Sequence, residues 1–447
     1  MTGPSAPRDK KLEELTDDDL ARELARRRAQ KLKGGGFLAA EDAGEAHAHG
    51  DQRLMLEGVL EQRMRTQDRS PKPCPKCGRP AGVKATHRAR TVRTMSGELT
   101  LQRHYHYCDA CRAGFYPLDR ELGLSEDGEV SPKLMTRILD FGVTTVFSEA
   151  AERWSVHHSG TTISENLVRR VVQRQGTALS QVPVEQRPKF IRPAPTAAAS
   201  LLVVQTDGSM LPMRAEAEWK EAKLGVIYRE DQHVPTTPTV RGQLSGPRYA
   251  VSLQGIDDFR VELDHALRAE RADEATTVAW VGDGAPWIWN LCDELCPNAV
   301  EVLDFMHMKQ HAADCGKAVL GIDSPWQDLW VDSIVSRIEH GRLDEVLGDL
   351  RDLQPMLPGD PLAAVDNLLG YYQTNARRMD YPAYKDAGLP IGSGTVESSN
   401  RHVLQKRMKL AGQHWTEPGA QRMAQLRATY KTTGPAAFAD LNLALAA

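Results

Sequence analysis

Acidic residues that follow strand-like runs are the first candidates for chemistry. The run LLVVQT ends in Asp207-Gly and the run TTVAWVG ends in Asp283-Gly, and we expect each glycine to allow a turn that leaves the carboxylate exposed beside a sheet. Glu397 opens a predicted helix after the glycine-rich turn GSGT. Hard ions such as Mg²⁺ take only a few protein oxygens, so two strand-end carboxylates and one helical carboxylate suit a pair of them. The three residues therefore predict metal-assisted phosphodiester chemistry.

Each of these acids also has a simpler interpretation. An isolated Asp-Gly at a strand end is more often a turn residue than a catalyst, and Glu397 with Arg401 is compatible with a surface pair on one helix. Asp304 follows another strand-like run, AVEVL, and competes with Asp283 as the second metal ligand. The order and context of the acids, taken together, favour the joint site.

Two Cys-x-x-Cys pairs form the strongest local motif. They are Cys74 with Cys77 and Cys108 with Cys111, and the thirty residues between the pairs include a predicted hairpin with a Ser-Gly turn. We expect the hairpin to bring the four thiolates around one structural Zn²⁺ in a zinc ribbon. Four reduced cysteines without a metal are the alternative.

Basic residues gather on three predicted segments. Between Pro71 and Pro117 there are nine Lys and Arg against two acids, an excess expected of a phosphate-binding face, although a ribbon that binds protein or only stabilises the fold is the alternative. The candidates for DNA contact in the ribbon are Arg88, Arg90, Arg93 and Arg103. The candidates on helices are Arg169, Arg170, Arg174, Arg401, Lys406 and Arg407, for which a solvated helix face is the simpler interpretation.

Composition limits the class of protein. The 447 residues include 56 basic and 60 acidic ones, and the net charge of −4 means that any DNA binding must come from local patches. A hydrophobic content of 41% is enough for packed cores and excludes a disordered chain. No run approaches the ~18 apolar residues of a membrane helix, and the start lacks the apolar segment of a secretory signal. We therefore predict a cytoplasmic protein without a membrane partner.

Changes in composition and in the predicted secondary-structure pattern divide the chain into several predicted domains. Charged helical patterns come first, with a predicted helix start where Thr16 is followed by three Asp, and strand and turn patterns follow, with the predicted strands TVRTM and ELTLQRHYHY. Two short helices joined by a Gly-containing turn then fit a helix-turn-helix. After a linker rich in Pro and Ala the pattern becomes α/β. The predicted divisions are an N-terminal helical region (1–70), a zinc ribbon (71–117), a helix-turn-helix domain (118–180), a linker (181–200), an α/β catalytic domain (201–430) with an all-α insertion (about 316–388), and a tail (431–447).

The order of the acids resembles that in DDE transposases, whose catalytic domain has an RNase H-like fold. In that family the first Asp lies on the first strand, the second Asp lies just after the fourth strand, and the Glu lies on a late helix. The helical segment from Trp326 to Tyr384 resembles the insertion of Mutator-like and hAT-like members, and Asp304-Phe-Met-His307 matches their Asp-x-x-His signature. With DGSM, GDGAPWIWN, LDFMH and GSGTVESSNR, roughly residues 70 to 430 are similar to bacterial insertion-sequence transposases of the ISKra type.

This resemblance implies a function and a set of roles. Asp207, Asp283 and Glu397 would hold two Mg²⁺ (or Mn²⁺) ions, with Asp304 and His307 in support, and for this reason we favour Asp283 over Asp304 as the second ligand. The protein would cleave and join DNA, and its ribbon and helix-turn-helix would recognise terminal inverted repeats. The implied partners are double-stranded DNA, both element ends and target, and further copies of the chain in a homodimer or larger homo-oligomer. It would act in the bacterial cytoplasm, on the nucleoid. A nuclease of the same fold without strand transfer, and a non-catalytic DNA-binding regulator derived from a transposase, are the alternatives.

Overall fold

The chain forms two compact units, which are described separately. The computed structural model describes residues 16–32, 36–125, 128–186, 192–214, 218–234, 239, 242–436 and 438. Unit 1 takes in residues up to 122 together with 126–131 and 154–162, and unit 2 takes in the other segments. Within these described ranges, no helix is both long enough and apolar enough to cross a bilayer.

The first helix of unit 1 begins where the charge pattern predicts. Helix α1 (Asp17–Lys31) starts after Thr16, whose hydroxyl oxygen accepts the Asp19 amide while the Asp19 carboxylate accepts the Thr16 amide. This capping box confirms the predicted helix start. Helix α2 (Phe37–Arg65) follows, and neither helix buries any residue. Residues 1–15 and 33–35 of the predicted N-terminal region lie outside the described residues.

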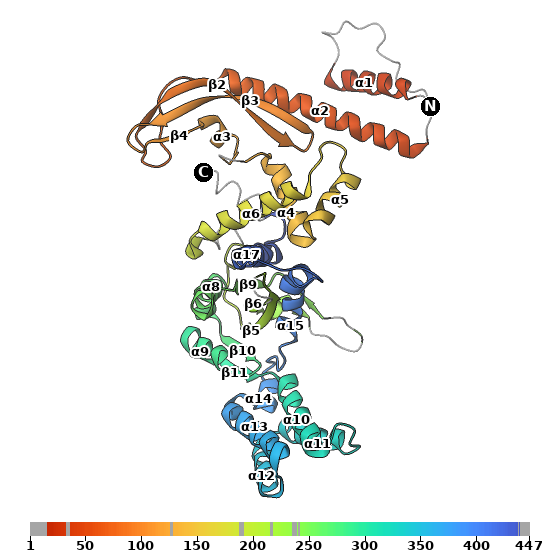
Figure 1. Cartoon of the computed structure of the whole chain (residues 1–447), viewed down its shortest axis with the longest axis vertical. Helices are drawn as coiled ribbons and strands as arrows, with labels where there is room; N and C mark the ends of the chain where they lie inside the picture. The colour runs from red at the N-terminus through yellow and green to blue at the C-terminus, as the bar shows by residue number, and fades with distance from the viewer. Residues whose placement is uncertain are drawn as a thin grey trace. The chain divides into compact units, whose positions relative to one another are not determined.

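The sheet of unit 1 is an antiparallel ribbon (Figure 1). Thr94 pairs with Gly97, which confirms the predicted hairpin and its turn, and Leu99 and Leu101 are buried along the second strand. The strands lie in the order β1 (Lys72–Pro73), β2 (Pro80–Thr94), β3 (Gly97–Cys108) and β4 (Ala113–Phe115), and helix α3 (Pro117–Glu121) follows. Strand β2 starts well before the predicted run TVRTM, because its pairing with β3 continues to Gly82.

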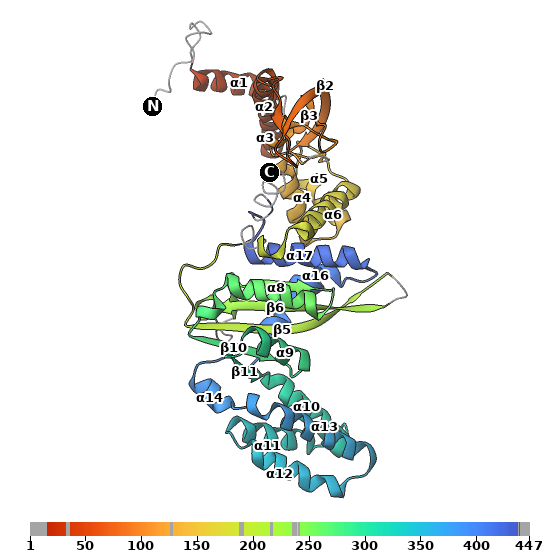
Figure 2. The ribbon, with the colours of Figure 1, turned by 90° about the vertical axis from the view of Figure 1, so that its left-hand side faces the viewer.

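Unit 2 contains a five-stranded mixed sheet. Its spatial order is β11 (Val300–Leu303), β10 (Thr277–Gly282), β5 (Leu201–Pro212), β6 (Trp219–Arg229) and β9 (Arg248–Ser252). The first three of these in chain order, β5, β6 and β9, pair antiparallel, whereas β10 and β11 run parallel to β5. Figure 2 shows α8 (Ile256–Ala269) lying along this sheet, and α9 (Pro286–Leu295) connects β10 to β11. Parallel neighbours end at the same edge of a sheet, which makes that edge the place to look for a site.

A cluster of helices follows β11 and lies beyond it in both views (Figures 1 and 2). It consists of α10 (Phe305–Leu320), α11 (Gln327–Glu339), α12 (Leu343–Leu353), α13 (Gly359–Asn375) and α14 (Tyr381–Asp386). Its buried side chains share one apolar core with the strands, which extends from Val204 and Trp280 to Ile334 and Tyr372. The segment where we predicted an all-α insertion is therefore helical, although α10 starts before residue 316.

The predicted linker does not separate two compact units. Before it come α4 (Pro132–Thr144), α5 (Phe147–His157) and α6 (Glu165–Gln181), and both α4 and α6 pack against the C-terminal helix α17 (Glu417–Thr433) inside unit 2. The reason is that α6 and α17 bury apolar faces against one another, which a composition shift cannot reveal. A 3-10 turn, Val184–Gln186, begins the linker.

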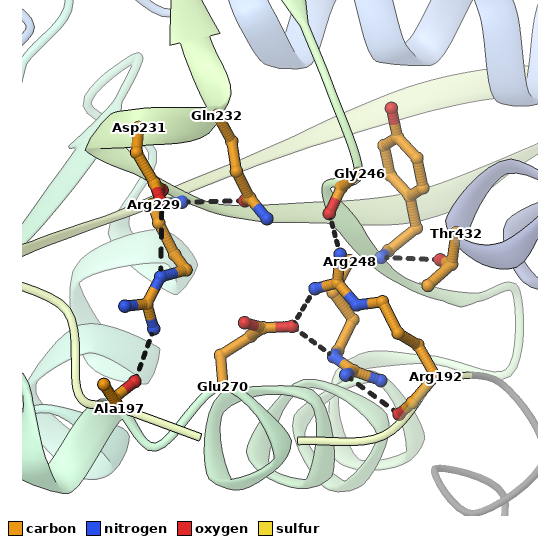
Figure 3. Close-up of polar contacts among 10 residues, drawn as sticks. Arg192, Ala197, Arg229, Asp231, Gln232, Gly246, Arg248, Glu270 and Thr432 are labelled. Carbon is orange, nitrogen blue, oxygen red and sulfur yellow. Dashed lines mark hydrogen bonds and ion pairs between the residues drawn. The ribbon is translucent and has the colours of Figure 1, made fainter. Parts of the chain in front are cut away.

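The end of the linker is attached to the sheet by charged side chains (Figure 3). Glu270, which is 1% exposed, accepts hydrogen bonds from the guanidinium groups of Arg248 and Arg192. Arg192 also donates to the Gly246 carbonyl, and Arg229 of β6 donates to the Ala197 carbonyl at 3.0 Å. These contacts fix the chain just before β5, the strand that carries Asp207.

Candidate active site

Three aspartates lie at neighbouring positions on adjacent strands, Asp207 within β5 and Asp283 and Asp304 just after the ends of β10 and β11. Val281 of β10 pairs with Gln205 of β5, so this register places Asp283 next to Asp207 two residues later on each chain segment. Gly282 pairs with Leu303 of β11, which places Asp304 next to Asp283 in the same way. The register therefore places the three aspartates along one edge of the sheet, where β10 and β11 end.

The expected turn at Asp207-Gly208 is not formed. Strand β5 continues to Pro212, because its antiparallel partner β6 extends beyond the end of β10. Asp207 thus lies within β5, at a position just beyond the end of the adjacent strand β10. A side-chain carbon at Gly208 would overlap the Glu221 carboxylate in its present position, so the Glu221 side chain would have to move.

Asp207 is held by two donors and is partly buried. Its Oδ2 accepts from Asn400 Nδ2 at 2.6 Å, and its Oδ1 accepts from the Gly208 amide at 2.7 Å. Burial raises the pKa of this carboxyl, and the charge of Asp283 raises the pKa further, against the opposing effect of these hydrogen bonds. The ionised form of Asp207 is therefore unfavourable in this site, and a bound cation would stabilise it.

Asp304 and His307 form the beginning of helix α10. The Asp304 carboxylate, buried to 1% exposure, accepts the amide of His307 at 2.8 Å and also the amide of Ser393. Although burial opposes ionisation, hydrogen bonds from His307 and Ser393 lower the pKa of Asp304 to about 2. Interaction with Asp304 is the main cause that raises the pKa of His307, and the charges of Asp283 and Glu397 add to the effect. His307 Nδ1 lies 3.6 Å from Asp304 Oδ1.

Glu397 reaches the same edge from helix α15 (Gly394–Ser399). The preceding turn is attached to β5 by Gln205, whose side chain donates to the Gly392 carbonyl at 3.1 Å and accepts the Val396 amide at 3.0 Å. Ser393 Oγ donates to Glu397 Oε1 at 3.3 Å. A π-helical turn, Asn400–Gln405, and the short helix α16 (Lys406–Met408) continue the chain.

The structure groups the acidic residues differently from the predicted magnesium set. Ligand atoms of Asp304, His307 and Glu397 all lie within 4.8 Å of one another. Asp207, Asp283 and Glu397 are not gathered to that spacing in the part of the chain that the structure describes. The charge of Asp283 nevertheless raises the pKa of Asp207, and the charges of Asp283 and Glu397 raise the pKa of His307. The five predicted side chains therefore lie in one region of the structure; they are Asp207, Asp283, Asp304, His307 and Glu397.

The four predicted cysteines come together in unit 1. The sulfur atoms of Cys74, Cys77, Cys108 and Cys111 lie within 4.8 Å of one another, a cluster that could bind a metal such as zinc. Although burial opposes the charged form, amide hydrogen bonds from residues 76 and 77 lower the pKa of Cys74 to about 7. Gly78 adopts a positive φ of 71° just after the first pair. The pair therefore lies on a tight turn, as metal ligands in a ribbon do.

Three of the predicted DNA-contact arginines are occupied inside the protein. Arg90 and Arg103, 9% and 8% exposed at the side chain, both donate to the buried Asp119 carboxylate. Arg407 is 1% exposed and donates to the Gly142 carbonyl at 3.3 Å. These three side chains cannot lie on an outer DNA-binding face, because folding has already buried their guanidinium groups. Sequence reasoning missed Asp119, which no local pattern links to either arginine.

The remaining basic candidates are at least partly accessible. Arg93 pairs with Glu98 at 3.0 Å, and Arg169 pairs with Glu165. Arg174 is half-buried. The exposed candidates are Arg88, Arg169, Arg170, Arg401 and Lys406.

Comparison with known proteins relates the sheet and its acidic edge to a protein family. The model of an uncharacterised protein family, UPF0236, matches residues 82–350. A protein of Streptococcus gallolyticus called "UPF0236 protein in vanSb 3'region" is 24% identical over 347 residues, which cover 76% of this chain and 72% of that protein. The family match includes Asp207, Asp283, Asp304 and His307, whereas Glu397 lies beyond it.

Proposed function

The chain belongs to the uncharacterised protein family UPF0236, and we propose that it is a transposase that binds the ends of an insertion sequence and catalyses Mg²⁺-dependent cleavage and strand transfer of DNA. The observation that carries this proposal is the placement of acidic side chains from three adjacent strands and one late helix at one edge of the sheet. Like charges placed this close repel one another, so the arrangement favours binding of divalent cations.

The order of the strands supports an RNase H-like catalytic domain. Asp207 lies on the first strand of the five-stranded sheet in chain order, and Asp283 directly follows the fourth. Glu397 lies on a helix that comes after the helical cluster. These positions agree with the DDE arrangement described above, including a helical segment between the second acid and the Glu.

The donor atoms suit a hard cation. We assign Asp207, Asp283 and Glu397 as the residues that would hold two Mg²⁺ or Mn²⁺ ions, with Asp304 and His307 beside them. Asn400 Oδ1 is buried at this edge without a hydrogen-bond partner among the described residues, and an amide oxygen is a ligand that such ions accept. Divalent ions bound there would neutralise the negative charge on the oxygens of the scissile phosphate.

The chain's own residues position the site and complement its charge. The Asn400 amide and the Gly208 amide fix the orientation of the Asp207 carboxylate. Asp304 holds His307 at the start of α10, and the raised pKa of His307 favours its protonated form beside the acids. An imidazolium with a half-exposed ring can donate a hydrogen bond to a phosphate oxygen of DNA.

DNA recognition is proposed for the regions that precede the sheet. The ribbon with its four-cysteine cluster and the helices α4 to α6 would bind terminal inverted repeats, using the exposed arginines 88, 169 and 170. Both element ends must be held at once for strand transfer, so we propose a homodimer or larger homo-oligomer on DNA.

A strand-transfer assay tests the catalytic proposal. Full-length protein is incubated with Mg²⁺ and duplexes that carry the ends flanking its gene, and Asp207→Asn, Asp283→Asn and Glu397→Gln are compared with wild type. We expect each substitution to reduce cleavage and joining by at least about 100-fold, because each removes a charged ligand. Asp328→Asn, an exposed change on α11, is the matched control and should keep wild-type activity. A variant that retains activity removes that residue from the site.

The same assay separates the other two functions. A pre-cut end with a free 3′-hydroxyl is joined to a second duplex by a transposase, whereas a nuclease of this fold leaves it unjoined. A non-catalytic regulator binds the ends but shows no metal-dependent cleavage.

A further inference from the structure

A cavity of about 600 Å³ opens in unit 2, away from the acidic edge. It lies between α6, the N-terminal part of α17, and the chain that follows β5. The side chains that give it chemical character are Phe147, Arg169, Arg214, Arg407, Trp415 and Arg422. Glu165, which pairs with Arg169, is the only carboxylate among its described lining residues.

Arg407 places a buried positive charge in the wall of the cavity. Its guanidinium carbon lies 4.8 Å from the ring centre of Phe147 and 5.5 Å from that of Trp415. Arg407 forms no ion pair within the described part of the chain, although its side chain is 1% exposed. A buried cation without a carboxylate partner is costly, and a bound anion would offset that cost. Burial lowers the pKa of Arg407 only to about 10, so the group remains charged at neutral pH.

The position of the cavity relates it to the acidic site. Trp415 and Arg214 are joined by main-chain hydrogen bonds, in which the Trp415 amide donates to Pro212 at 3.0 Å and the Arg214 amide donates to Trp415 at 2.8 Å. Pro212 lies five residues after Asp207 on β5, which corresponds to about 17 Å along a strand. One strand of B-form DNA rises about 3.4 Å per nucleotide, so this span matches roughly five nucleotides.

Basic residues also lead from one place to the other along the chain. Arg401 and Lys406 are exposed and lie between Glu397 and Arg407. A run of cations that starts beside an acidic site and ends in a cavity fits an extended polyanion better than a small isolated anion. Arginine suits phosphate because its planar guanidinium can form two parallel hydrogen bonds to phosphate oxygens.

We infer that this cavity binds a backbone phosphate of the DNA strand that enters the acidic site, about five nucleotides from the phosphate that is cleaved. The inference rests on the proposed function for the identity of the polyanion. Arg214 and Arg422 contact the phosphate from the open side, and Arg407 supplies the buried positive charge. Trp415 and Phe147 hold the guanidinium of Arg407 in place.

DNA binding of the full chain without Mg²⁺ tests this site apart from catalysis. Anisotropy of a labelled 30-base-pair duplex is measured from 0.1 to 1 M salt for wild type and for the double variant Arg214→Ala/Arg422→Ala. Each phosphate contact contributes a slope of about 0.9 in the logarithm of affinity against the logarithm of salt concentration. Because both arginines contact the same phosphate, we expect the slope to fall by about 0.9 and the affinity at 0.1 M salt to fall on the order of 8-fold.

A matched variant removes the same number of charges elsewhere. Arg268→Ala/Arg351→Ala changes arginines of α8 and α12 that do not line the cavity, and it should keep the wild-type slope. Thermal unfolding of both variants checks that each is folded.

Two further results keep the test decisive. If the cavity double variant has the same salt slope and the same DNA affinity as its control, the inference is overturned. A rise in the melting temperature of the wild type with inorganic phosphate would not rescue it, because that would show binding of a free anion only. Asp207→Asn should bind DNA with the wild-type slope and lose cleavage. If Asp207→Asn keeps cleavage while the cavity double variant shows the expected loss of slope, the catalytic proposal alone is rejected.

Discussion

Asn400 and Asp207, 193 residues apart in the chain, are joined by a hydrogen bond of 2.6 Å from Asn400 Nδ2 to Asp207 Oδ2. Asn400 is 3% exposed and stands at the start of the π-helical turn that follows Glu397. The bond therefore ties the strand that carries the first acid to the helix that carries the last one. Their relative position does not depend on a metal ion alone.

We expect Asn400→Ala to weaken metal binding and activity while the fold is kept. Loss of the donor leaves Asp207 free to rotate, and removal of a residue that orients a ligand commonly costs about 10- to 100-fold in affinity or activity. Titration of Mn²⁺ binding and a single-turnover cleavage assay measure the effect. Asn298→Ala, an exposed change after α9, is the control. Unchanged Mn²⁺ affinity in Asn400→Ala would rule out the positioning role.

Stability at low pH should depend on Asp304. Its pKa in the folded chain, about 2, lies below the ordinary value near 3.9, so its stabilising contribution is complete above about pH 4 and is lost as pH falls from 4 towards 2. The size is on the order of 2 kcal/mol. Urea unfolding of metal-free protein at pH 6, 4 and 3 measures the loss. Asp304→Asn should be less stable at pH 6 and should lose less stability on acidification, and an equal loss in both proteins would contradict the assignment.

Residues with a clear local pattern could be found from the sequence. Asp207 and Asp283 each end an apolar run, the two Cys pairs have metal-ligand spacing, and the capping box at Thr16 is a short-range signal. The role of Gln205 could also be predicted from the sequence, because a polar side chain inside the apolar run LLVVQT needs a hydrogen-bond partner. The structure gives that partner as the turn before Glu397.

Features that depend on contacts between residues far apart in the chain could not be predicted from the sequence. The continuation of β5 past Asp207 requires β6, which begins at Trp219 opposite Pro212. The burial of Arg103 requires Asp119, which joins it only after the ribbon folds. The packing of α6 on α17 likewise links the two sides of the predicted linker, and nothing near either helix in the sequence indicates it.

Removal of Asp119 should destabilise unit 1 strongly. Asp119→Ala leaves the guanidinium group of Arg103 buried without the carboxylate that it pairs with, and the loss of one partner from a buried pair costs about 3–5 kcal/mol. Hydrogen exchange of the β2 and β3 amides measures the effect within the unit. Glu98→Ala removes an exposed partner of Arg93 and should cost less than about 1 kcal/mol. Similar protection in the two variants would show that the buried pair does not stabilise the ribbon.

The four-cysteine cluster should bind about one equivalent of zinc that stabilises the ribbon. Cys74 and Cys108 are 3% and 1% exposed, and each comes from a different Cys pair, so Cys74→Ser/Cys108→Ser removes one ligand from each side of the site. We expect bound zinc to fall from about one equivalent to near zero, because two thiolates alone do not complete a tetrahedral site. Chelation of the wild type should lower the hydrogen-exchange protection of β2 and β3 in the same way, since metal binding is coupled to folding. Cys292→Ser/Cys315→Ser, which changes two buried cysteines of unit 2, controls for loss of sulfur and should retain the metal. Unchanged zinc in the ribbon variant would mean that the four sulfur atoms are close only because the hairpin packs them together.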